Sequence, residues 1–190
     1  MSINILGGKA RGFKLQVPPD SITRPTSVML KRRLFDWRQD WSDHSFVDLC
    51  AGSGAMGFEA LSRGAKTVWL NEPNKTAYKI LEKNAQSWID KIKLDEQKLH
   101  LSSRPFLNFL PSLLAQQSEE MVIFFDPPYE NHRMYDDFWQ ALSGFQGELW
   151  VESDNLKGVK LDDQRQHLSE VVKELTQGSH WMLVGRGARR

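Results

Sequence analysis

The chain has 190 residues, enough for one ordinary globular domain with a sizeable hydrophobic core. Its single cysteine, Cys50, excludes an internal disulfide framework and a cysteine-rich zinc site, and its histidines lack metal-ligand spacing, so we expect no metal. No hydrophobic signal segment opens the chain and no stretch approaches the length of a membrane span, so we expect a soluble, cytoplasmic protein.

Charge is unevenly distributed along the chain. Residues 1–38 hold eight Lys and Arg against two Asp, a balance of +6, and the whole chain sums to +1. The remaining 152 residues therefore sum to −5 (+1 minus +6). Such a split indicates a basic arm that meets a polyanion, although a solvated amphipathic helix would give the same composition.

The first predicted elements are a hairpin and a helix. Residues 3–17 alternate apolar and polar side chains around glycines, which is typical of a β-hairpin, and its flexible tip at 9–12 carries two cations. After a pair of prolines, Thr26 or Ser27 can cap a helix that continues to about Trp37.

From residue 46 onward strands and helices alternate, which predicts an α/β fold with a mostly parallel sheet and helices on both faces. Strands are expected at 46–49, 67–71, 99–102, 122–125, 148–152, 168–175 and 180–184, and helices at 55–63, 74–88, 106–116 and 135–143.

A glycine-rich turn follows the first of these strands. Gly52, Gly54 and Gly57 fit G-x-G-x-x-G, a pattern that allows a tight turn and a close approach of helix to strand. Glu72 comes 20 positions after Gly52, a spacing that suits a carboxylate holding ribose hydroxyls. By itself the pattern fits a nicotinamide or flavin dinucleotide or S-adenosylmethionine (SAM). The candidate cofactor residues here are Asp48, Ala51, Gly52, Ser53, Gly54 and Glu72.

A second motif decides between these cofactors. The run Asp126-Pro127-Pro128-Tyr129 follows a continuous apolar strand, at the end where open α/β sheets bind ligands. Two prolines stiffen the turn and leave its carbonyls free of competing N–H donors. The Asp126 carboxylate and the Pro127 carbonyl can take both hydrogens of an exocyclic amine, and Tyr129 can stack on a planar base. These four residues are the candidate catalytic residues of a SAM-dependent methyltransferase acting on an amino nitrogen.

Two other residues are candidates for a catalytic or substrate-orienting role. Cys50 could be a nucleophile, as in enzymes that methylate carbon 5 of pyrimidines, but its apolar neighbours favour a small buried residue. Glu152, which ends the strand after the proline motif, could orient a substrate.

The chain resembles the bacterial RsmD family of methyltransferases, which modify the N2 amine of one guanine in small-subunit (16S) ribosomal RNA. The resemblance covers nearly the whole length. It is carried by Leu6-Gly7-Gly8 with Arg11-Gly12 and Lys14-Leu15, Arg24-Pro25-Thr26 with Leu34-Phe35, residues 48–65, Glu72, residues 126–129 and Val151-Glu152-Ser153. It implies a class I methyltransferase (Rossmann-like) sheet of seven strands, the last antiparallel, with residues 39–190 as the SAM-dependent domain.

The resemblance also implies that residues 1–38 are the RNA arm. The implied RNA contacts are Lys9, Arg11, Lys14, Arg24, Lys31, Arg32 and Arg33. It adds Ser103 to the cofactor site, near the place where the family tends to have an Asp that can hold the adenine amine. The family usually follows R-P-T with an acidic residue and an arginine, where this chain has Val28 and Met29.

We therefore expect an rRNA guanine-N2 methyltransferase that uses SAM, releases S-adenosylhomocysteine and acts as a monomer, on naked RNA or an assembled small-subunit particle. The nearest alternative methylates adenine N6 in DNA or RNA, or a protein glutamine, with the same four-residue motif. An alternative of another class is a catalytically silent module that binds SAM or a nucleotide together with RNA.

Overall fold

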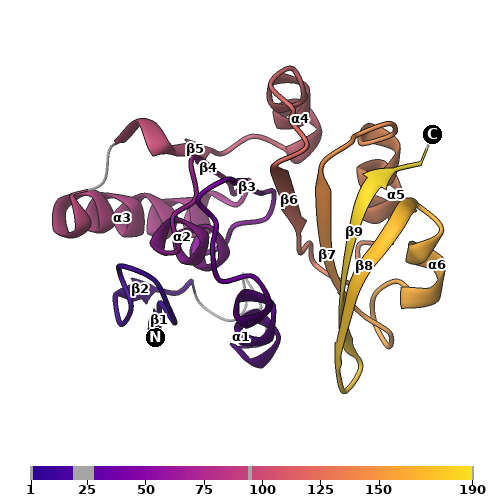
Figure 1. The fold of residues 1–190 in the computed structure, drawn as a ribbon, viewed down its shortest axis with the longest axis horizontal. Coiled ribbons are helices and arrows are strands. Elements are labelled where there is room, and N and C mark those ends of the chain that lie inside the picture. The colour runs from indigo at the N-terminus through magenta and orange to yellow at the C-terminus, as the bar shows by residue number, and fades with distance from the viewer. Residues whose placement is uncertain (1, 19–27, 94–95, 190) are drawn as a thin grey trace.

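A computed structural model describes residues 2–18, 28–93 and 96–189 (Figure 1). The strands are β1 (Ser2–Asn4), β2 (Lys14–Gln16), β3 (Ser45–Asp48), β4 (Val68–Asn71), β5 (Leu99–Ser102), β6 (Met121–Phe125), β7 (Glu148–Asp154), β8 (Leu168–Gln177) and β9 (His180–Ala188). The helices are α1 (Val28–Trp37), α2 (Ala55–Ser62), α3 (Lys75–Ile92), α4 (Phe106–Leu114), α5 (His132–Ala141) and α6 (Leu161–Arg165), with a 3-10 turn at Glu96–Lys98.

Seven strands form the main sheet, in the order β5-β4-β3-β6-β7-β9-β8. β9 is antiparallel to both of its neighbours, and the other pairs are parallel. The predicted α/β sheet with an antiparallel last strand is therefore confirmed. β1 and β2 pair separately as the predicted antiparallel hairpin.

Alternate residues of β3, β4, β6, β7 and β9 enter two hydrophobic clusters, one on each face of the sheet. The first contains Phe46, Phe124 and Trp150 together with residues of the hairpin, α1, α2 and α3. The second contains Val47 and Phe125 together with residues of α4, α5 and α6. Figure 1 shows the same division, with α1–α3 and the hairpin on one side of the sheet and α4–α6 on the other. A central strand buried on both faces has to be apolar throughout, as β6 is.

α2 approaches the sheet closely because it contains a glycine. A Cβ on Gly57 would lie 2.3 Å from a methyl of Leu70 and 2.8 Å from a methyl of Val68, both on β4. The third glycine of the G-x-G-x-x-G pattern therefore serves helix–strand packing, as the pattern predicts.

The N-terminal hairpin and α1 are attached to α2 through one buried carboxylate. Glu59 is 0% exposed and accepts hydrogen bonds from the backbone N–H groups of Leu6 and Gly7, each at 2.8 Å. It also accepts one from Nε of Arg63 at 2.9 Å, and Nζ of Lys31 on α1 lies 3.9 Å away. Hydrophobic residues of the hairpin and α1 belong to the first core cluster. The division of function at residue 38 stays a prediction.

The expected flexible tip of the hairpin is instead fixed to the end of α2. The backbone N–H of Lys9 donates to the Ser62 carbonyl at 2.7 Å, and that of Ala10 donates to Ser62 Oγ at 2.9 Å. Gly8 has φ +74°, and a Cβ there would lie 2.0 Å from the Ser62 carbonyl oxygen. Glycine is needed at this position for both reasons.

Several elements differ from their predicted bounds; β9, for example, continues to Ala188 rather than ending at residue 184, and α5 begins at His132 rather than at residue 135. α3 continues to Ile92, beyond the predicted end at residue 88, because Ile89 and Ile92 extend its partly buried stripe. β7 continues to Asp154 because β9 pairs with it as far as His180. The five-residue helix α6 is absent from the prediction, being too short for a helical period to show. The predicted cap at Thr26 or Ser27 lies outside the described residues.

None of the helices in the described part of the chain has both the length and the apolar character needed to cross a bilayer.

Replacing Glu59 by glutamine should destabilise the protein by about 3 kcal/mol or more, because it leaves buried cations and backbone donors without their carboxylate. Urea unfolding followed by circular dichroism measures this. Asp43→Asn is the matched control, since Asp43 is exposed and forms only a 3.9 Å surface pair with Lys66; it should change stability by at most about 0.5 kcal/mol. Equal effects of the two substitutions would contradict a central role for Glu59.

Candidate functional site

The carboxyl ends of four neighbouring parallel strands bring the acidic candidates together. β4, β3, β6 and β7 lie side by side in that order. Asp48 is the last residue of β3, Glu72 follows β4 and Asp126 follows β6. Because Asp48 pairs with Leu70 and with Phe124, these three ends lie at the same level of the sheet. This edge is where open α/β sheets bind their ligands.

The glycine turn is held against the end of β4 by backbone hydrogen bonds. The N–H of Gly52 donates to Oε2 of Glu72 at 2.8 Å, and the N–H of Ala51 donates to the Asn71 carbonyl at 2.9 Å. The other oxygen of Glu72 accepts from the N–H of Asn74 at 2.8 Å. Burial raises the pKa of Glu72 above its usual range. A carboxylate has about four acceptor positions, so Glu72 keeps capacity for further donors.

Gly54 adopts a left-handed conformation, with φ +82°, where the turn enters α2. A Cβ at Gly54 would lie 2.6 Å from the Phe58 ring and 2.7 Å from a methyl of Leu81. The backbone conformation and the close packing both require glycine here. Ser53, the residue between Gly52 and Gly54, is buried with them, and its carbonyl accepts a hydrogen bond from Asn84 at 2.9 Å.

Asp48 is buried at the start of this turn and caps it. Its Oδ1 accepts a hydrogen bond from the N–H of Cys50 at 3.2 Å. Burial raises the pKa of Asp48 well above its usual range, and the neighbouring carboxylates Asp126 and Glu72 raise it further, while Lys31 opposes them. The expected contact of Asp48 with the methionine end of SAM stays a prediction beside this capping role.

The proline motif places a tyrosine beside β7. Asp126 is half-buried and Tyr129 is buried, with its hydroxyl donating to Oε1 of Glu152 at 3.2 Å. Burial raises the pKa of Tyr129, and the charges of Asp126 and Glu152 raise it further, so the phenol stays protonated. The Tyr129 ring lies 5.7 Å from the imidazole of His180, which begins β9. The motif and its neighbours therefore form one packed corner at the carboxyl edge.

Cys50 does not have the surroundings of a nucleophile. Burial raises the pKa of its thiol, and the nearby Asp48, Asp126 and Glu72 raise it further. A thiol with a raised pKa forms little thiolate, which is the reactive species.

Five of the candidate RNA contacts lie on the surface. Lys9, Arg11 and Lys14 are exposed on the hairpin, and Arg32 and Arg33 on α1. Arg33 donates to the Thr176 carbonyl at the end of β8, and Arg32 lies 3.6 Å from Asp36. Arg24 lies outside the described residues.

Lys31 does not belong to this surface, and its prediction as an RNA contact is corrected. It is 5% exposed, and its Nζ donates to the Ala55 carbonyl at 2.9 Å. Burial lowers the pKa of Lys31 to about 8, while Glu59 and Asp48 oppose this effect. The amine therefore points into the molecule, towards the first turn of α2.

Ser103 is exposed and follows β5, the strand next to β4. The preceding residue, Ser102, accepts a hydrogen bond through its carbonyl from the N–H of Glu72 at 2.9 Å. Ser103 is therefore the neighbour, in the chain, of a residue that contacts the backbone of Glu72. A role of Ser103 in binding a cofactor stays a prediction.

Comparison with known proteins places this site in a family. The family model described as "Conserved hypothetical protein 95" matches residues 3–184. "Ribosomal RNA small subunit methyltransferase D" (RsmD) of Haemophilus influenzae is 32% identical over 181 residues, covering 93% of this chain and 89% of the relative. The protein of the same name from Escherichia coli is 34% identical over 165 residues, covering 83% and 77%. The chain belongs to the RsmD family.

The fold agrees with this assignment. A solved structure from Escherichia coli matches all of both chains with a TM-score of 0.75 and 26% sequence identity. The fold of this RsmD-family protein is therefore the one that the sequence predicts.

Sequence reasoning missed the residues that connect the hairpin to the glycine turn. Asn84 of α3 is buried, accepts from the N–H of Gln16 at 2.8 Å and donates to the Gln16 carbonyl at 2.9 Å. Its amide also donates to the Ser53 carbonyl at 2.9 Å. The sequence shows that an asparagine lies on the apolar face of this amphipathic helix, which indicates a buried polar contact. It does not show which distant residues make that contact.

The buried amine of Lys31 should make stability depend on pH. Between about pH 8 and its ordinary pKa of 10.5, the unfolded chain binds a proton that the folded RsmD-family protein does not bind, so stability rises with pH. Relative to Lys31→Met, the wild type should gain about 3 kcal/mol of unfolding free energy across this range. Urea unfolding of both proteins at pH 7 to 10.5 measures the difference. If the difference in unfolding free energy between the wild type and Lys31→Met does not change with pH, burial does not alter the pKa of Lys31.

Proposed function

We propose that this protein transfers a methyl group from SAM to the exocyclic N2 amine of a guanine in small-subunit ribosomal RNA, and therefore works in the cytoplasm. The observation that carries the proposal is the placement of Asp126-Pro127-Pro128-Tyr129 directly after β6, the strand that pairs with β3, and β3 leads into the glycine turn at the same edge of the sheet. Membership of the RsmD family supports the SAM-dependent methylation of ribosomal RNA. The choice of guanine N2 rests on resemblance to that family.

The residues at the end of β4 and in the glycine turn fit SAM. Glu72 keeps acceptor positions for ribose hydroxyls, and the glycine backbone allows close approach. The cationic amino group of the methionine end would oppose the effect of burial on the pKa of Asp48 and favour its ionised carboxylate. SAM supplies the methyl group, whose bond to sulfur breaks as its bond to N2 forms, leaving S-adenosylhomocysteine.

The proline motif would prepare the target amine. The lone pair of an exocyclic amine is delocalised into the ring, so the nitrogen is a weak nucleophile. Hydrogen bonds from its two N–H groups to the Asp126 carboxylate and the Pro127 carbonyl favour a pyramidal nitrogen, whose lone pair can then point at the methyl group. The negative charge of Asp126 also stabilises the positive charge that develops on N2, which later loses a proton. Positioning and electrostatics account for the catalysis.

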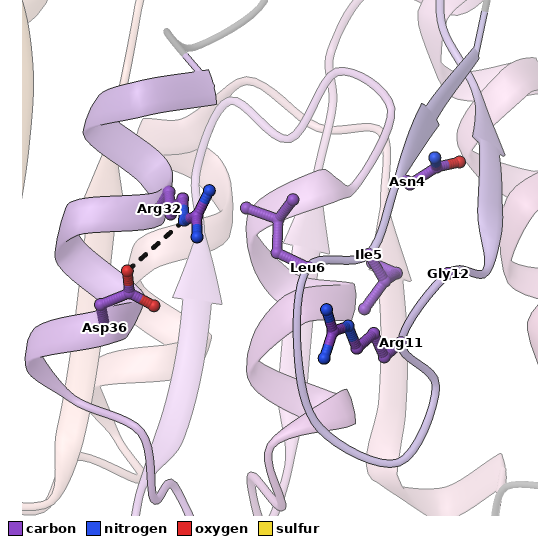
Figure 2. Close-up of a pocket in the computed structure, with 7 residues that line it drawn as sticks. All are labelled: Asn4, Ile5, Leu6, Arg11, Gly12, Arg32 and Asp36. Atoms are coloured by element: carbon purple, nitrogen blue, oxygen red, sulfur yellow. Dashed lines mark ion pairs between the residues drawn. The ribbon is translucent and has the colours of Figure 1, made fainter.

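RNA would meet the exposed basic residues of the hairpin and α1. An open groove separates these two elements; its lining is Asn4, Ile5, Leu6, Arg11, Gly12, Arg32 and Asp36 (Figure 2). The guanidinium groups of Arg11 and Arg32 thus reach one groove from two elements. The exposed pair of Arg32 with Asp36 is worth at most about 1 kcal/mol, so a phosphate can replace Asp36 at little cost. A target guanine must be unstacked or extruded to reach the catalytic edge.

Replacing Glu72 by glutamine should weaken SAM binding by about 1.5–3 kcal/mol, because the ribose loses a charged acceptor. Isothermal titration calorimetry should show one SAM site per chain and tighter binding of SAM than of NAD. Glu82→Gln, an exposed position on α3, is the control and should leave the affinity unchanged. Unaltered SAM affinity in Glu72→Gln would remove Glu72 from the site.

Asp126→Ala should lower kcat by at least about 10²-fold while SAM still binds, because it removes one preorganised electrostatic group. Asp126→Asn keeps an acceptor oxygen but removes the negative charge. A moderate decrease of kcat in this variant would mean that Asp126 acts mainly by orienting the amine. A decrease of kcat as large as in Asp126→Ala would mean that it acts mainly through its charge. Mass spectrometry of hydrolysed product should show N2-methylguanosine. N6-methyladenosine instead would favour the adenine alternative, and methyl-transfer activity of any kind rules out the silent module.

The double variant Arg11→Gln, Arg32→Gln should flatten the salt dependence of RNA affinity by about 1.5 in the slope of log K against log salt, since each phosphate contact contributes about 0.7–0.9. Filter binding at several salt concentrations measures the slope. Lys66→Gln is the control, because Lys66 is exposed just before β4, at the opposite edge of the sheet. An unchanged slope in the double variant would place the RNA surface elsewhere.

A further inference from the structure

Glu152 is a buried acidic residue at the catalytic edge for which the methyl transfer described above has no role. It is 0% exposed and lies within β7, the strand beside β6, which Asp126 follows. Burying a carboxylate is costly, so a position of this kind needs a reason in the fold or in the ligand.

The register of the sheet sets Glu152 beside Asp126. Phe125 of β6 pairs with Val151 of β7 in a parallel ladder, so the residues that follow this pair, Asp126 and Glu152, start from the same level of the sheet. Neighbouring strands are separated by about 4.8 Å. Two residues earlier, Phe124 and Trp150 both belong to the first core cluster, which places the even-numbered positions of both strands on one face.

Tyr129 connects the two carboxylates. Its hydroxyl donates to Oε1 of Glu152 at 3.2 Å, and the charges of both Asp126 and Glu152 act on that hydroxyl. The backbone of Glu152 is fixed as well, because the hydroxyl of Tyr135 donates to its carbonyl at 3.1 Å. The carboxylate of Glu152 therefore has a set position between the motif and β7.

Two neighbouring acceptors match one kind of base edge. Guanine presents its N1–H next to the N2 amine, so two hydrogen-bond donors stand side by side. Adenine and cytosine present an unprotonated ring nitrogen, an acceptor, next to their exocyclic amine. An ionised carboxylate is an acceptor only, so it pairs with N1–H of guanine and repels the ring lone pair of the other two bases.

We propose that Glu152 is a specificity-determining residue that accepts a hydrogen bond from N1–H of the target guanine while Asp126 accepts from its N2 amine. The inference rests on the proposed guanine-N2 methylation and names the feature that selects this base. The motif Asp126-Pro127-Pro128-Tyr129 by itself suits guanine, adenine or cytosine amines, and Glu152 on the adjacent strand β7 would select guanine among them. The hydrogen bond from Tyr129 then links the proline motif to the group that would read the edge of the base.

The test uses a base that keeps the amine and lacks the neighbouring donor. 2-Aminopurine carries the exocyclic 2-amine of guanine, but its N1 has no hydrogen. Mass spectrometry of ribosomal RNA methylated by the wild-type protein first locates the modified guanine. RNA with guanine or 2-aminopurine at that single position, naked and in reconstituted small-subunit particles, is then assayed with radiolabelled SAM, and kcat/KM is compared.

The wild type should prefer guanine over 2-aminopurine by about 10²-fold, the scale of one hydrogen bond to a charged group. Glu152→Gln should lower this ratio by at least about tenfold, because the amide of glutamine can donate to the bare N1. Glu148→Gln is the matched control: Glu148 is buried on the same face of β7 at the opposite edge, where it pairs with Arg38 at 2.8 Å, and its variant should keep the wild-type ratio.

A wild-type preference within about threefold would overturn the inference, and so would an unchanged ratio in Glu152→Gln. If Glu152→Gln does not fold, the wild-type comparison still tests the inference, because the absence of a preference for guanine would overturn it. 2-Aminopurine also lacks the guanine oxygen O6. The wild type and the variant are assayed with the same two bases, so the loss of O6 enters both ratios and cancels when the ratios are compared. A wild-type protein that methylates no guanine overturns the proposed function itself, whereas guanine methylation with an unchanged ratio overturns only the role of Glu152.

Discussion

The buried carboxylate of Glu59 is the constraint on which the N-terminal third of the molecule depends. Leu6 and Gly7 of the hairpin loop, Lys31 of α1 and Arg63 after α2 all direct N–H groups at it. A fully buried carboxylate is stable only when such partners surround it. Removing any one of these segments would expose or unbalance this charge, so the hairpin, α1 and α2 hold their relative positions together.

That constraint fixes where the groove between the hairpin and α1, which we propose faces RNA, lies relative to the carboxyl edge of the sheet. The hairpin is attached to α2 through Glu59 and to the glycine turn through Asn84, which bonds both Gln16 and the Ser53 carbonyl. α2 begins at the end of that turn. The groove between the hairpin and α1 is therefore held at a set distance from the carboxylates at the ends of the strands, which a rigid RNA substrate requires.

The sequence predicts the order of strands and helices because their apolar periods are local. It reveals the glycine-turn and proline motifs because each is contiguous in the chain. It does not predict the contacts made between distant residues. Lys31 stands in a run of three cations and looks exposed, yet its partner Glu59 lies 28 positions away in the chain. Asn84 likewise meets a residue 68 positions earlier. Glu152 could be noticed from its place at a strand end, but only the register of β6 and β7 shows that it stands beside Asp126.

The position of β9 bears on how the protein is made. β9 is the last strand of the described chain, yet it lies inside the sheet, paired with β7 on one side and β8 on the other. During synthesis β7 therefore has an unpaired edge until residues 180–188 have been added, which takes roughly a few seconds at ribosomal rates. An open apolar edge invites pairing with another chain, and charged side chains along it discourage this. Glu148, Glu152 and Asp154 supply such charges on β7, so Glu152, which we propose reads the base, would also help to protect the nascent strand.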